Sequence, residues 1–422
     1  MAQPFALTSI TRSLDPATAQ YIKSGYGQQF TLSDNQVFNQ ADPVPAEPLQ
    51  GQRPSAFLLN PNNIPLCITG RAPFQPGQAQ YHMTAVAPGP NALTLESDNF
   101  DAQGNANGAA DFQTLGTGTF RLAPGTPAIN SPFRAAGQWT FSILDNLGHV
   151  VATATAQLEL YFFLGPHALP TTSQEHLLDL LRIAIPDYAT IANQQWADVE
   201  EAVVENMANN LWALGANMQR RYDVRVKKGG KSRHLLNYDA KDGSYTFNLE
   251  TFMLKTIVYS NCYDLAVLTM LACDALGCRP DPQNNGATVK VLQCWATAGQ
   301  PWGYITDGPL FGYATDQSRR CNNPFWDGLP PPVPSTPWHL PQKDTLRDYF
   351  YSHCIAVFTR AADKTPRIID VCHGSIDANN AISIFAGNLN GVQYFNLAVD
   401  PVGPLVIGKA TTFDVKCRDI LT

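Results

Sequence analysis

The sequence is poor in charged residues and has no apolar run long enough to cross a bilayer. Only 15% of its 422 residues are charged, and the formal net charge is -7. A net charge this small for the length argues against a general binder of nucleic acids or anionic membranes. A membrane-spanning helix needs about 20 consecutive apolar residues, and no stretch supplies them. We therefore expect neither nucleic acid nor membrane as a partner.

The motifs that bind common cofactors and metals are also missing. No glycine-rich phosphate loop or dinucleotide fingerprint follows a predicted strand, and there is no CxxC pair or HExxH motif. Cys262 and Cys273 fall in one predicted helix, about 16 Å apart along its axis, which is too far to share an ion. We therefore expect no cofactor and no metal, although single ligands are present in Cys273, Cys278, Cys294, Cys321, Cys354, Cys372 and His373.

The first residues lack the basic and apolar regions of a secretory signal. The nine cysteines are an odd number and are scattered along the chain, without the spacing of a small disulfide scaffold. Reduced thiols in a cytosol-like compartment are the default for such a pattern. We expect a cytoplasmic protein, or one exported by a route without a conventional signal peptide.

The length predicts more than one domain, because single cores rarely exceed about 250–300 residues. Residues 1–50 are rich in Gln, Asn and Pro and are predicted to form an irregular N-terminal arm with one edge strand at most. Residues 51–168 contain short apolar runs separated by turn residues, and Pro166 and Pro170 mark a boundary. Residues 169–422 form the predicted second domain.

The clearest unit of the first domain is a β-hairpin. Trp139, Phe141 and Ile143 alternate with polar residues, 145–148 supplies turn chemistry, and 150–160 returns with strong strand propensity. Repeated strands of this kind predict an antiparallel β-sandwich of immunoglobulin-like type. With helices in the second domain, the fold class is α+β.

Apolar periodicity predicts three helices in the second domain. A capping box at 172–175 precedes the first, and Pro186 ends it. The second covers about 196–218, with apolar residues every three or four positions. The third begins near Cys262 and ends at Gly277, and it is hydrophobic nearly all round. We therefore expect the third helix to be central and buried.

Two further segments suggest surfaces. Residues 220–233 hold seven of the 28 basic residues of the chain, which predicts a solvated hairpin or a docking site for an acidic partner. Residues 279–350 are rich in aromatic side chains. These side chains either line an extended peptide groove or pack their own loop down, and the sequence favours neither.

Cys262 is the candidate nucleophile. Ser260 or Asn261 as N-cap places the thiol in the first turn of the third helix, where unpaired amides and the helix dipole favour the thiolate. We expect a lowered pKa for Cys262 and exposure of the helix tip at a cleft. His353 opens a predicted strand and Asp370 lies near the end of the next one, so a base and an orienting carboxylate are present.

A cysteine on a buried helix, a histidine opening a strand and an aspartate 17 residues later resemble the catalytic core of the transglutaminase-like superfamily, a branch of the papain-like cysteine enzymes. The resemblance covers about residues 170–390 and implies a central helix packed on an antiparallel sheet. It differs in three respects: Tyr259-Ser260 stands where a glycine is frequent, Cys354-Ile355 stands where an aromatic residue is frequent, and the spacing of 91 residues from Cys262 to His353 is longer than in compact bacterial members.

The resemblance implies the catalytic residues Cys262, His353 and Asp370, with a protein or peptide as substrate. The thiolate attacks an amide carbonyl, and the acceptor decides between proteolysis, glutamine deamidation and transamidation. The Cys262 amide would be one oxyanion donor. Candidates for the second donor are Asn261, Gln293 and Trp295. The alternative function is a non-catalytic binding or structural protein with a degenerate core.

Overall fold

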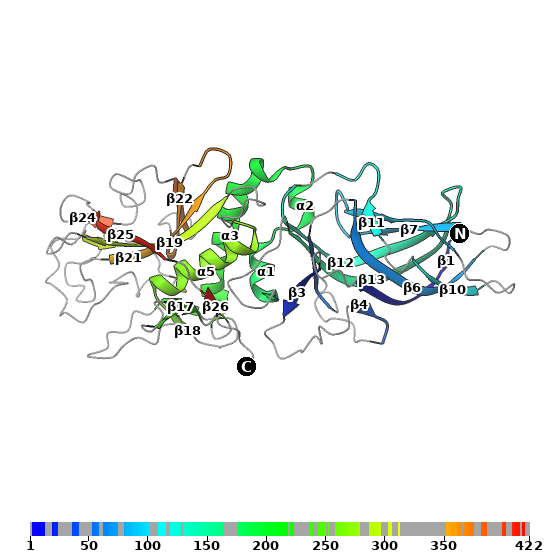
Figure 1. Cartoon of the computed structure of the whole chain (residues 1–422), viewed down its shortest axis with the longest axis horizontal. Helices are drawn as coiled ribbons and strands as arrows, with labels where there is room; N and C mark the ends of the chain where they lie inside the picture. The colour runs from blue at the N-terminus through cyan, green and yellow to red at the C-terminus, as the bar shows by residue number, and fades with distance from the viewer. Residues whose placement is uncertain are drawn as a thin grey trace. The chain divides into compact units, whose positions relative to one another are not determined.

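The computed structural model has a mixed α+β fold with a large curled sheet and few helices (Figure 1). The chain divides into two compact units, 1–167 with 174–199 and 168–173 with 200–422, and the division falls within helix α3 (Trp196–Asn217). The structure describes residues 2–12, 19–23, 36–41, 53–58, 62–74, 80–101, 109–114, 119–127, 130–163, 175–217, 220–222, 236–239, 244–247, 249, 252, 258–278, 287–296, 303–305, 311–312, 352–364, 366–374, 381–385, 399–401, 407–413 and 416–417.

The N-terminal unit is built around one 14-stranded sheet, in which the path β14-β3-β5-β13-β12-β7-β8-β11-β6-β2-β4 is extended by β1, β9 and β10. Strand β13 also contacts β2, β4 and β6 from the far end of this path, so the sheet curls back on itself. The strands are β1 (Gln3–Pro4), β2 (Ala6–Arg12), β3 (Ala19–Lys23), β4 (Gln36–Asn39), β5 (Ser55–Leu58), β6 (Ile64–Pro73), β7 (Gln80–Val86), β8 (Thr94–Ser97), β9 (Phe100–Asp101), β10 (Ala109–Gln113), β11 (Thr119–Leu122), β12 (Phe133–Leu144), β13 (Val150–Phe163) and β14 (Glu175–Leu177).

The predicted hairpin is confirmed as β12 and β13, which pair antiparallel with Trp139 opposite Ala156. Trp139, Phe141 and Ile143 are buried, as their alternation predicted. Four of the strands, β1 to β4, lie in the segment that was predicted as an irregular arm. The difference arises because Leu7 and Ile10 of β2 are buried in the sheet, where β2 pairs with both β4 and β6.

Two short helices, α1 (Leu178–Ala184) and α2 (Tyr188–Ile191), belong to the same unit. Arg182 of α1 donates to both carboxylate oxygens of Glu159 on β13, at 2.9 and 2.6 Å. Arg134 lies 3.1 Å from the same carboxylate, and the Tyr161 hydroxyl donates to it at 2.6 Å. Glu159 is fully buried, so this network supplies the partners that a buried charge requires.

The C-terminal unit contains a five-stranded antiparallel sheet, in the order β23-β22-β21-β19-β25. Helix α5 (Cys262–Ala275) packs against its strands β19, β21 and β22. Every residue of α5 except Tyr263 is buried, which confirms the predicted central helix. The sheet strands are β19 (Thr288–Ala296), β21 (Ser352–Thr359), β22 (Pro366–Gly374), β23 (Ala381–Phe385) and β25 (Ile407–Phe413).

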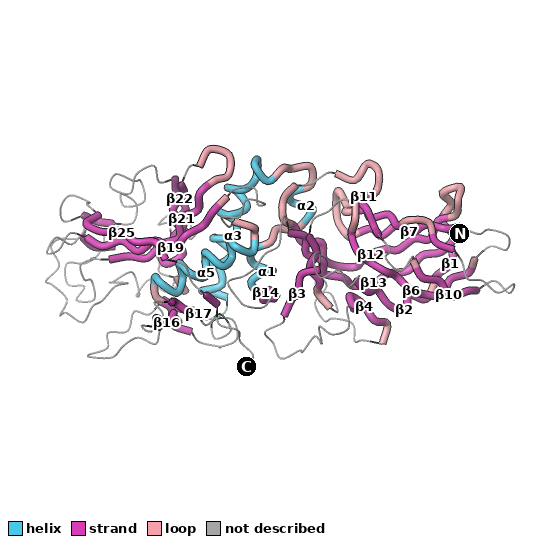
Figure 2. Tube along the Cα trace, viewed as in Figure 1, coloured by secondary structure: helices cyan, strands magenta, loops and turns pink. Residues whose placement is uncertain are grey.

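Smaller sheets complete this unit, as the tube view indicates (Figure 2). Strands β15 and β18 pair in parallel, and β18 is followed by Asn261 and the start of α5. No helix in the described part of the chain is long and apolar enough to span a membrane. The remaining strands are β15 (Arg220–Tyr222), β16 (Leu236–Asp239), β17 (Ser244–Phe247), β18 (Val258–Ser260), β20 (Gly303–Ile305), β24 (Val399–Pro401) and β26 (Lys416–Cys417).

Candidate active site

A complete capping box fixes the start of α5. The Asn261 side chain accepts a hydrogen bond from the Asp264 amide at 3.0 Å, and the Asp264 carboxylate accepts one from the Asn261 amide at 3.0 Å. The C-terminal end is equally defined, because Gly277 has a φ of 88° and lies one residue past the C-cap, Leu276. Both ends agree with the sequence prediction, and Cys262 is the first residue of the helix.

The sulfur of Cys262 receives hydrogen bonds from the backbone amides of Tyr263 and Cys354, and both lower the pKa of the thiol. Burial is the larger effect and raises that pKa well above its ordinary value of 9.0, and the nearby carboxylates of Asp370 and Asp264 raise it further. The side chain is 1% exposed. The predicted lowering of the pKa and the predicted exposure at a cleft are therefore both wrong for this conformation, because burial outweighs the helix terminus.

His353 and Asp370 meet as the sequence predicted. Nε2 of His353 lies 2.7 Å from Oδ2 of Asp370, and the two side chains are 3% and 2% exposed. They come from the adjacent strands β21 and β22, on the same face of the sheet. The contact turns Nε2 toward the carboxylate, and the other ring nitrogen, Nδ1, is also buried.

Cys262 approaches this pair from the helix side. The backbone amide that bonds its sulfur belongs to Cys354, the residue directly after His353, and the Asp370 carboxylate acts on the thiol. Cys262 thus lies close to Cys354 and Asp370 at the start of α5, and His353 is the chain neighbour of Cys354. Their arrangement contains a thiol, an imidazole and the carboxylate that orients the imidazole, which are the groups of a cysteine nucleophile.

Tyr222 is a site residue that sequence reasoning missed. Its hydroxyl accepts a hydrogen bond from the backbone amide of Cys262 at 3.1 Å, and its side chain is fully buried. Burial raises the pKa of Tyr222 well above 10.0, and the neighbouring Cys262, Cys372 and Asp370 raise it further. A signal was available: Tyr222 ends a short strand that pairs with the residues just before Cys262.

A backbone bridge holds Tyr222 in place. The Tyr222 amide donates to the Phe311 carbonyl at 2.8 Å, and the Phe311 amide donates to the Cys372 carbonyl at 2.9 Å. Phe311 is buried, and a Cβ added at Gly215 of α3 would come within 2.5 Å of the Gly312 amide nitrogen. The 311–312 turn therefore ties β15, β22 and α3 together beside the site.

Cys372 lies next to the His353 and Asp370 pair. Ligand-type atoms of His353, Asp370 and Cys372 lie within 4.8 Å of one another, and all three residues are buried. The Cys372 amide donates to Oδ1 of Asp370 at 2.8 Å. Burial, followed by the charge of Asp370, raises the pKa of the Cys372 thiol well above 9.0.

None of the three candidates for the second oxyanion donor is placed at the sulfur by the contacts of the described residues. Asn261 uses its side-chain oxygen in the helix cap, and Gln293 donates to the Tyr263 hydroxyl. The Trp295 side chain lies outside the described residues. The Cys262 amide, the predicted first donor, donates its hydrogen bond to the Tyr222 hydroxyl.

The two segments predicted as surfaces are described only in part. In the basic segment, Arg220 is buried, donates to the Phe252 carbonyl at 2.6 Å and lies over the Phe252 ring, so this residue is structural. Positions 223–233 lie outside the described residues. In the aromatic segment, Phe311 packs inside the unit, and its other aromatic side chains lie outside the described residues.

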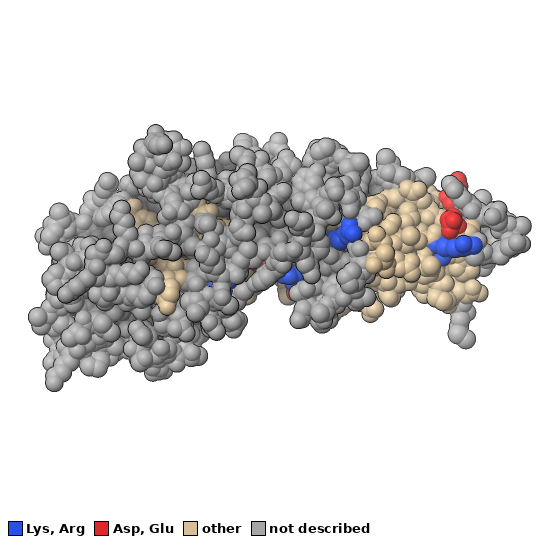
Figure 3. All heavy atoms as spheres, turned by 90° about the horizontal axis from the view of Figure 1, so that it is seen from below, with Lys and Arg blue, Asp and Glu red and all other residues tan. Residues whose placement is uncertain are grey.

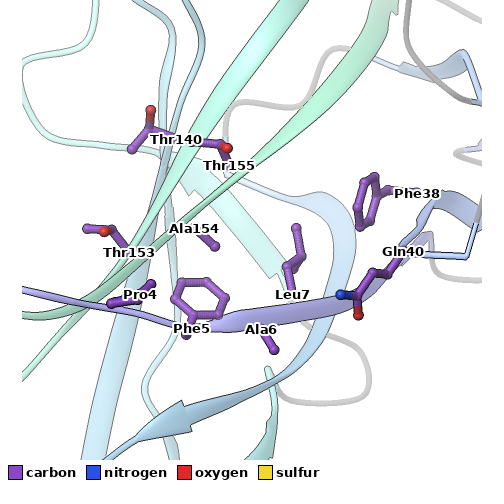
Figure 4. Close-up of a pocket in the computed structure, with 10 residues that line it drawn as sticks. All are labelled: Pro4, Phe5, Ala6, Leu7, Phe38, Gln40, Thr140, Thr153, Ala154 and Thr155. Carbon is purple, nitrogen blue, oxygen red and sulfur yellow. The ribbon is translucent and has the colours of Figure 1, made fainter. Parts of the chain in front are cut away.

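The N-terminal unit has a different kind of concavity, of about 530 Å³ (Figure 4). Phe5 and Leu7 lie near one side of it, and Thr140, Thr153 and Thr155 come from the β12–β13 hairpin. Its lining contains threonine, glutamine and apolar residues but no titratable side chain. On the described part of the face seen in Figure 3, most atoms belong to uncharged residues.

Comparison of the chain with models of known protein families and with curated proteins finds no match.

Proposed function

We propose that this chain is a cysteine-dependent acyl-transfer enzyme with a transglutaminase-like core, acting on protein or peptide amides through a thioester. The observation that carries the proposal is the buried 2.7 Å contact between His353 and Asp370, next to the helix start that holds Cys262. A carboxylate on one ring nitrogen leaves the other to exchange a proton with the nucleophile, which is the arrangement that triads share.

The proposed reaction has two halves. Nδ1 of His353 takes the thiol proton of Cys262 while the sulfur attacks the amide carbonyl carbon, and the imidazolium then protonates the leaving amine. This gives a thioester on Cys262 and free ammonia or a free amine. Water or a second amine, deprotonated by His353, then attacks the thioester carbonyl and releases the thiol. Asp370 stays ionised and holds the ring throughout.

Tyr222 lies where a second hydrogen-bond donor to the oxyanion would be needed. Its hydroxyl oxygen marks a position 3.1 Å from the Cys262 amide nitrogen, which is the distance expected between an oxyanion and its donor. A carbonyl oxygen that moves to this amide would displace the phenolic oxygen, and the phenolic O–H could then donate to the same oxygen. Tyr222 is therefore the proposed second donor, in place of Asn261, Gln293 and Trp295.

The proposal includes an immunoglobulin-like sandwich as the N-terminal unit. Its support is a predominantly antiparallel sheet that curls so that β13 contacts β2 and β6. The product remains a choice between proteolysis, deamidation and transamidation, because the acceptor decides it. A cytoplasmic location, or export without a conventional signal, belongs to the same proposal.

The test is a set of amide-turnover assays with a matched cysteine control. Purified protein is incubated with a glutamine-containing protein and a labelled primary amine, and ammonia, peptide fragments and incorporated label are measured. We expect turnover by the parent and by Cys273→Ala, which alters a buried cysteine at the other end of α5, and none by Cys262→Ala. Intact mass after an acid quench should show the acyl adduct on Cys262. Turnover that survives in the Cys262→Ala variant would remove the proposal.

A second candidate, a binding or structural protein with a degenerate core, is favoured by one observation. Cys262 is 1% exposed, and burial raises the pKa of its thiol, which disfavours the thiolate. Alkylation in the presence and absence of a peptide amide separates the two functions. If the chain is an enzyme, the alkylation rate of Cys262 should change when the peptide is added. If it is a binding protein, Cys262 and Cys273 should be equally unreactive with and without the peptide.

A further inference from the structure

The group formed by His353, Asp370 and Cys372 offers a chemistry that the proposed triad does not use. It combines an imidazole nitrogen, a carboxylate oxygen and a thiol sulfur within 4.8 Å of one another. Each side chain is 2–3% exposed. Nitrogen, oxygen and sulfur donors in one buried group are the ligands that Zn²⁺ takes in proteins.

We propose that His353, Asp370 and Cys372 form a Zn²⁺ site whose occupation switches the active site off. Metal binding itself rests only on the three ligands. The inhibitory effect rests on the proposed function, because the ion would take the two side chains that serve as base and orienting carboxylate.

The backbone brings the three ligands together on one face of the sheet. Asp370 and Cys372 are two residues apart on β22 and share one face of the sheet, and His353 lies on the adjacent strand β21. The Cys372 amide donates to Oδ1 of Asp370 at 2.8 Å, and the Cys372 carbonyl accepts from the Phe311 amide at 2.9 Å. The ligands are therefore held by paired strands and a bridged turn.

A small separation of His353 from Asp370 would admit the ion between these two ligands. Zinc lies about 2.0–2.2 Å from nitrogen and oxygen ligands, so two such ligands of a tetrahedral ion are roughly 3.3 Å apart. His353 and Asp370 are now 2.7 Å apart, so the ion would replace their hydrogen bond and separate them by roughly 0.6 Å. Cys262 lies outside the 4.8 Å group, which leaves the fourth position to water.

Charge also favours the ion. A carboxylate and one thiolate carry two negative charges, so their complex with Zn²⁺ is neutral, and a neutral group is far less costly to bury than an isolated charge. The thiol of Cys372 must lose its proton to bind, so zinc uptake releases one proton per site and weakens as the pH falls.

The experiment measures metal binding directly, so it does not depend on activity. Protein stripped with a chelator and kept reduced is titrated with ZnCl₂, and bound metal is measured after desalting. Titration with Co²⁺ reports thiolate ligation through its charge-transfer absorption. We expect one ion per chain. The Cys372→Ala and Cys372→Ser variants should lose at least ~100-fold in affinity together with the charge-transfer band, since loss of a ligand exceeds the 10–100-fold effect of an outer partner.

The matched control is Cys294→Ala. Cys294 is a buried cysteine directly across from His353 in the β19–β21 pairing, but it is outside the ligand group. This variant should bind zinc like the parent, and far-UV and near-UV circular dichroism should show that all variants are folded. A parent that retains no metal, or Cys372 variants that bind as tightly as the parent, would overturn the site.

Activity then tests the inhibitory half separately. Zinc should abolish amide turnover by the parent and should leave turnover by Cys372→Ser largely unchanged. If zinc binds through Cys372 but leaves turnover unchanged or increases it, the inhibitory role is wrong and the metal site stands. If no amide turnover is found in any variant, the proposed enzyme function fails and the binding measurements still decide the metal site.

Discussion

The Asp370→Asn variant tests the proposed chemistry most directly. Asn has the shape of Asp, so its side-chain oxygen can still accept the Cys372 amide, which now donates to Asp370 at 2.8 Å. Its other terminal atom becomes an NH₂ group, which must face Nε2 of His353 at the present 2.7 Å contact. An NH₂ group donates, so Nε2 becomes an acceptor and the ring proton moves to Nδ1. Nδ1 can then no longer accept the thiol proton.

The expected loss is large in catalysis and small in stability. The same substitution in a serine triad lowers kcat by about 10⁴-fold, so we expect ~10³–10⁴-fold here, or roughly 4–5.5 kcal/mol. One neutral hydrogen bond replaces a charge-assisted one, so the free energy of unfolding should change by about 1–2 kcal/mol. Asp370→Ala, in contrast, would leave a buried imidazole without its partner and should destabilise the fold more.

Two readouts separate positioning from folding. Ammonia release gives kcat, and ¹⁵N NMR of the histidine side chains identifies which ring nitrogen carries the proton. We expect the proton of His353 on Nε2 in the parent and on Nδ1 in the D370N variant. Asp274→Asn, a buried carboxyl at the other end of α5, should keep full activity. A folded D370N variant within about threefold of parental activity, or with an unchanged tautomer, would refute this reasoning.

Three further predictions concern single side chains. Tyr222→Phe should lower kcat by ~10²–10³-fold with a smaller change in KM, because the proposed second oxyanion donor is lost. It should also reduce the free energy of unfolding by about 1–3 kcal/mol, because the Cys262 amide loses its acceptor. Turnover equal to that of the parent would exclude Tyr222 as an oxyanion donor. Glu159→Gln should lower the free energy of unfolding of the N-terminal unit by about 3–5 kcal/mol, since Arg134 and Arg182 lose their counter-ion. Urea unfolding measures this change, and an unchanged urea midpoint would contradict the prediction. Burial raises the pKa of Cys294 to about 12 from 9.0, so the contribution of this thiol to stability should be full below pH 9 and fall by up to roughly 4 kcal/mol as the pH rises toward 12. Cys294→Ala should remove this share of the pH dependence of the free energy of unfolding, and a pH profile identical to that of the parent would contradict the prediction.

The sequence predicted the parts of the fold that depend on neighbouring residues. The ends of α5 follow from Asn261 and Gly277, because caps are made by residues next to the helix. The contact of His353 with Asp370 follows from their spacing on two strands that pair antiparallel. The β12–β13 hairpin follows from its alternating side chains and its turn, since register is set by exactly these local features.

The sequence could not predict what covers Cys262. Its burial comes from groups far apart along the chain: Tyr222 lies 40 residues before it, and Cys354 lies on a strand about 90 residues later. The 311–312 turn joins the first of these groups to Cys372 through two backbone hydrogen bonds. Such contacts depend on tertiary packing and carry no local pattern, so the helix start alone suggested an exposed, acidic thiol.

The opposed effects on Cys262 define the state in which the proposed enzyme would rest. Two backbone amides and the helix start favour the thiolate, but burial and two carboxylates outweigh them, so the sulfur holds its proton. Ionising the thiol alone would leave a buried negative charge beside Asp370, whereas transferring its proton to His353 creates a positive charge between them. The thiolate is therefore favoured only as part of an ion pair with the imidazolium. Removal of Asp370's charge should thus weaken the pair, and catalysis should depend on the histidine and the carboxylate together rather than on a pre-ionised sulfur.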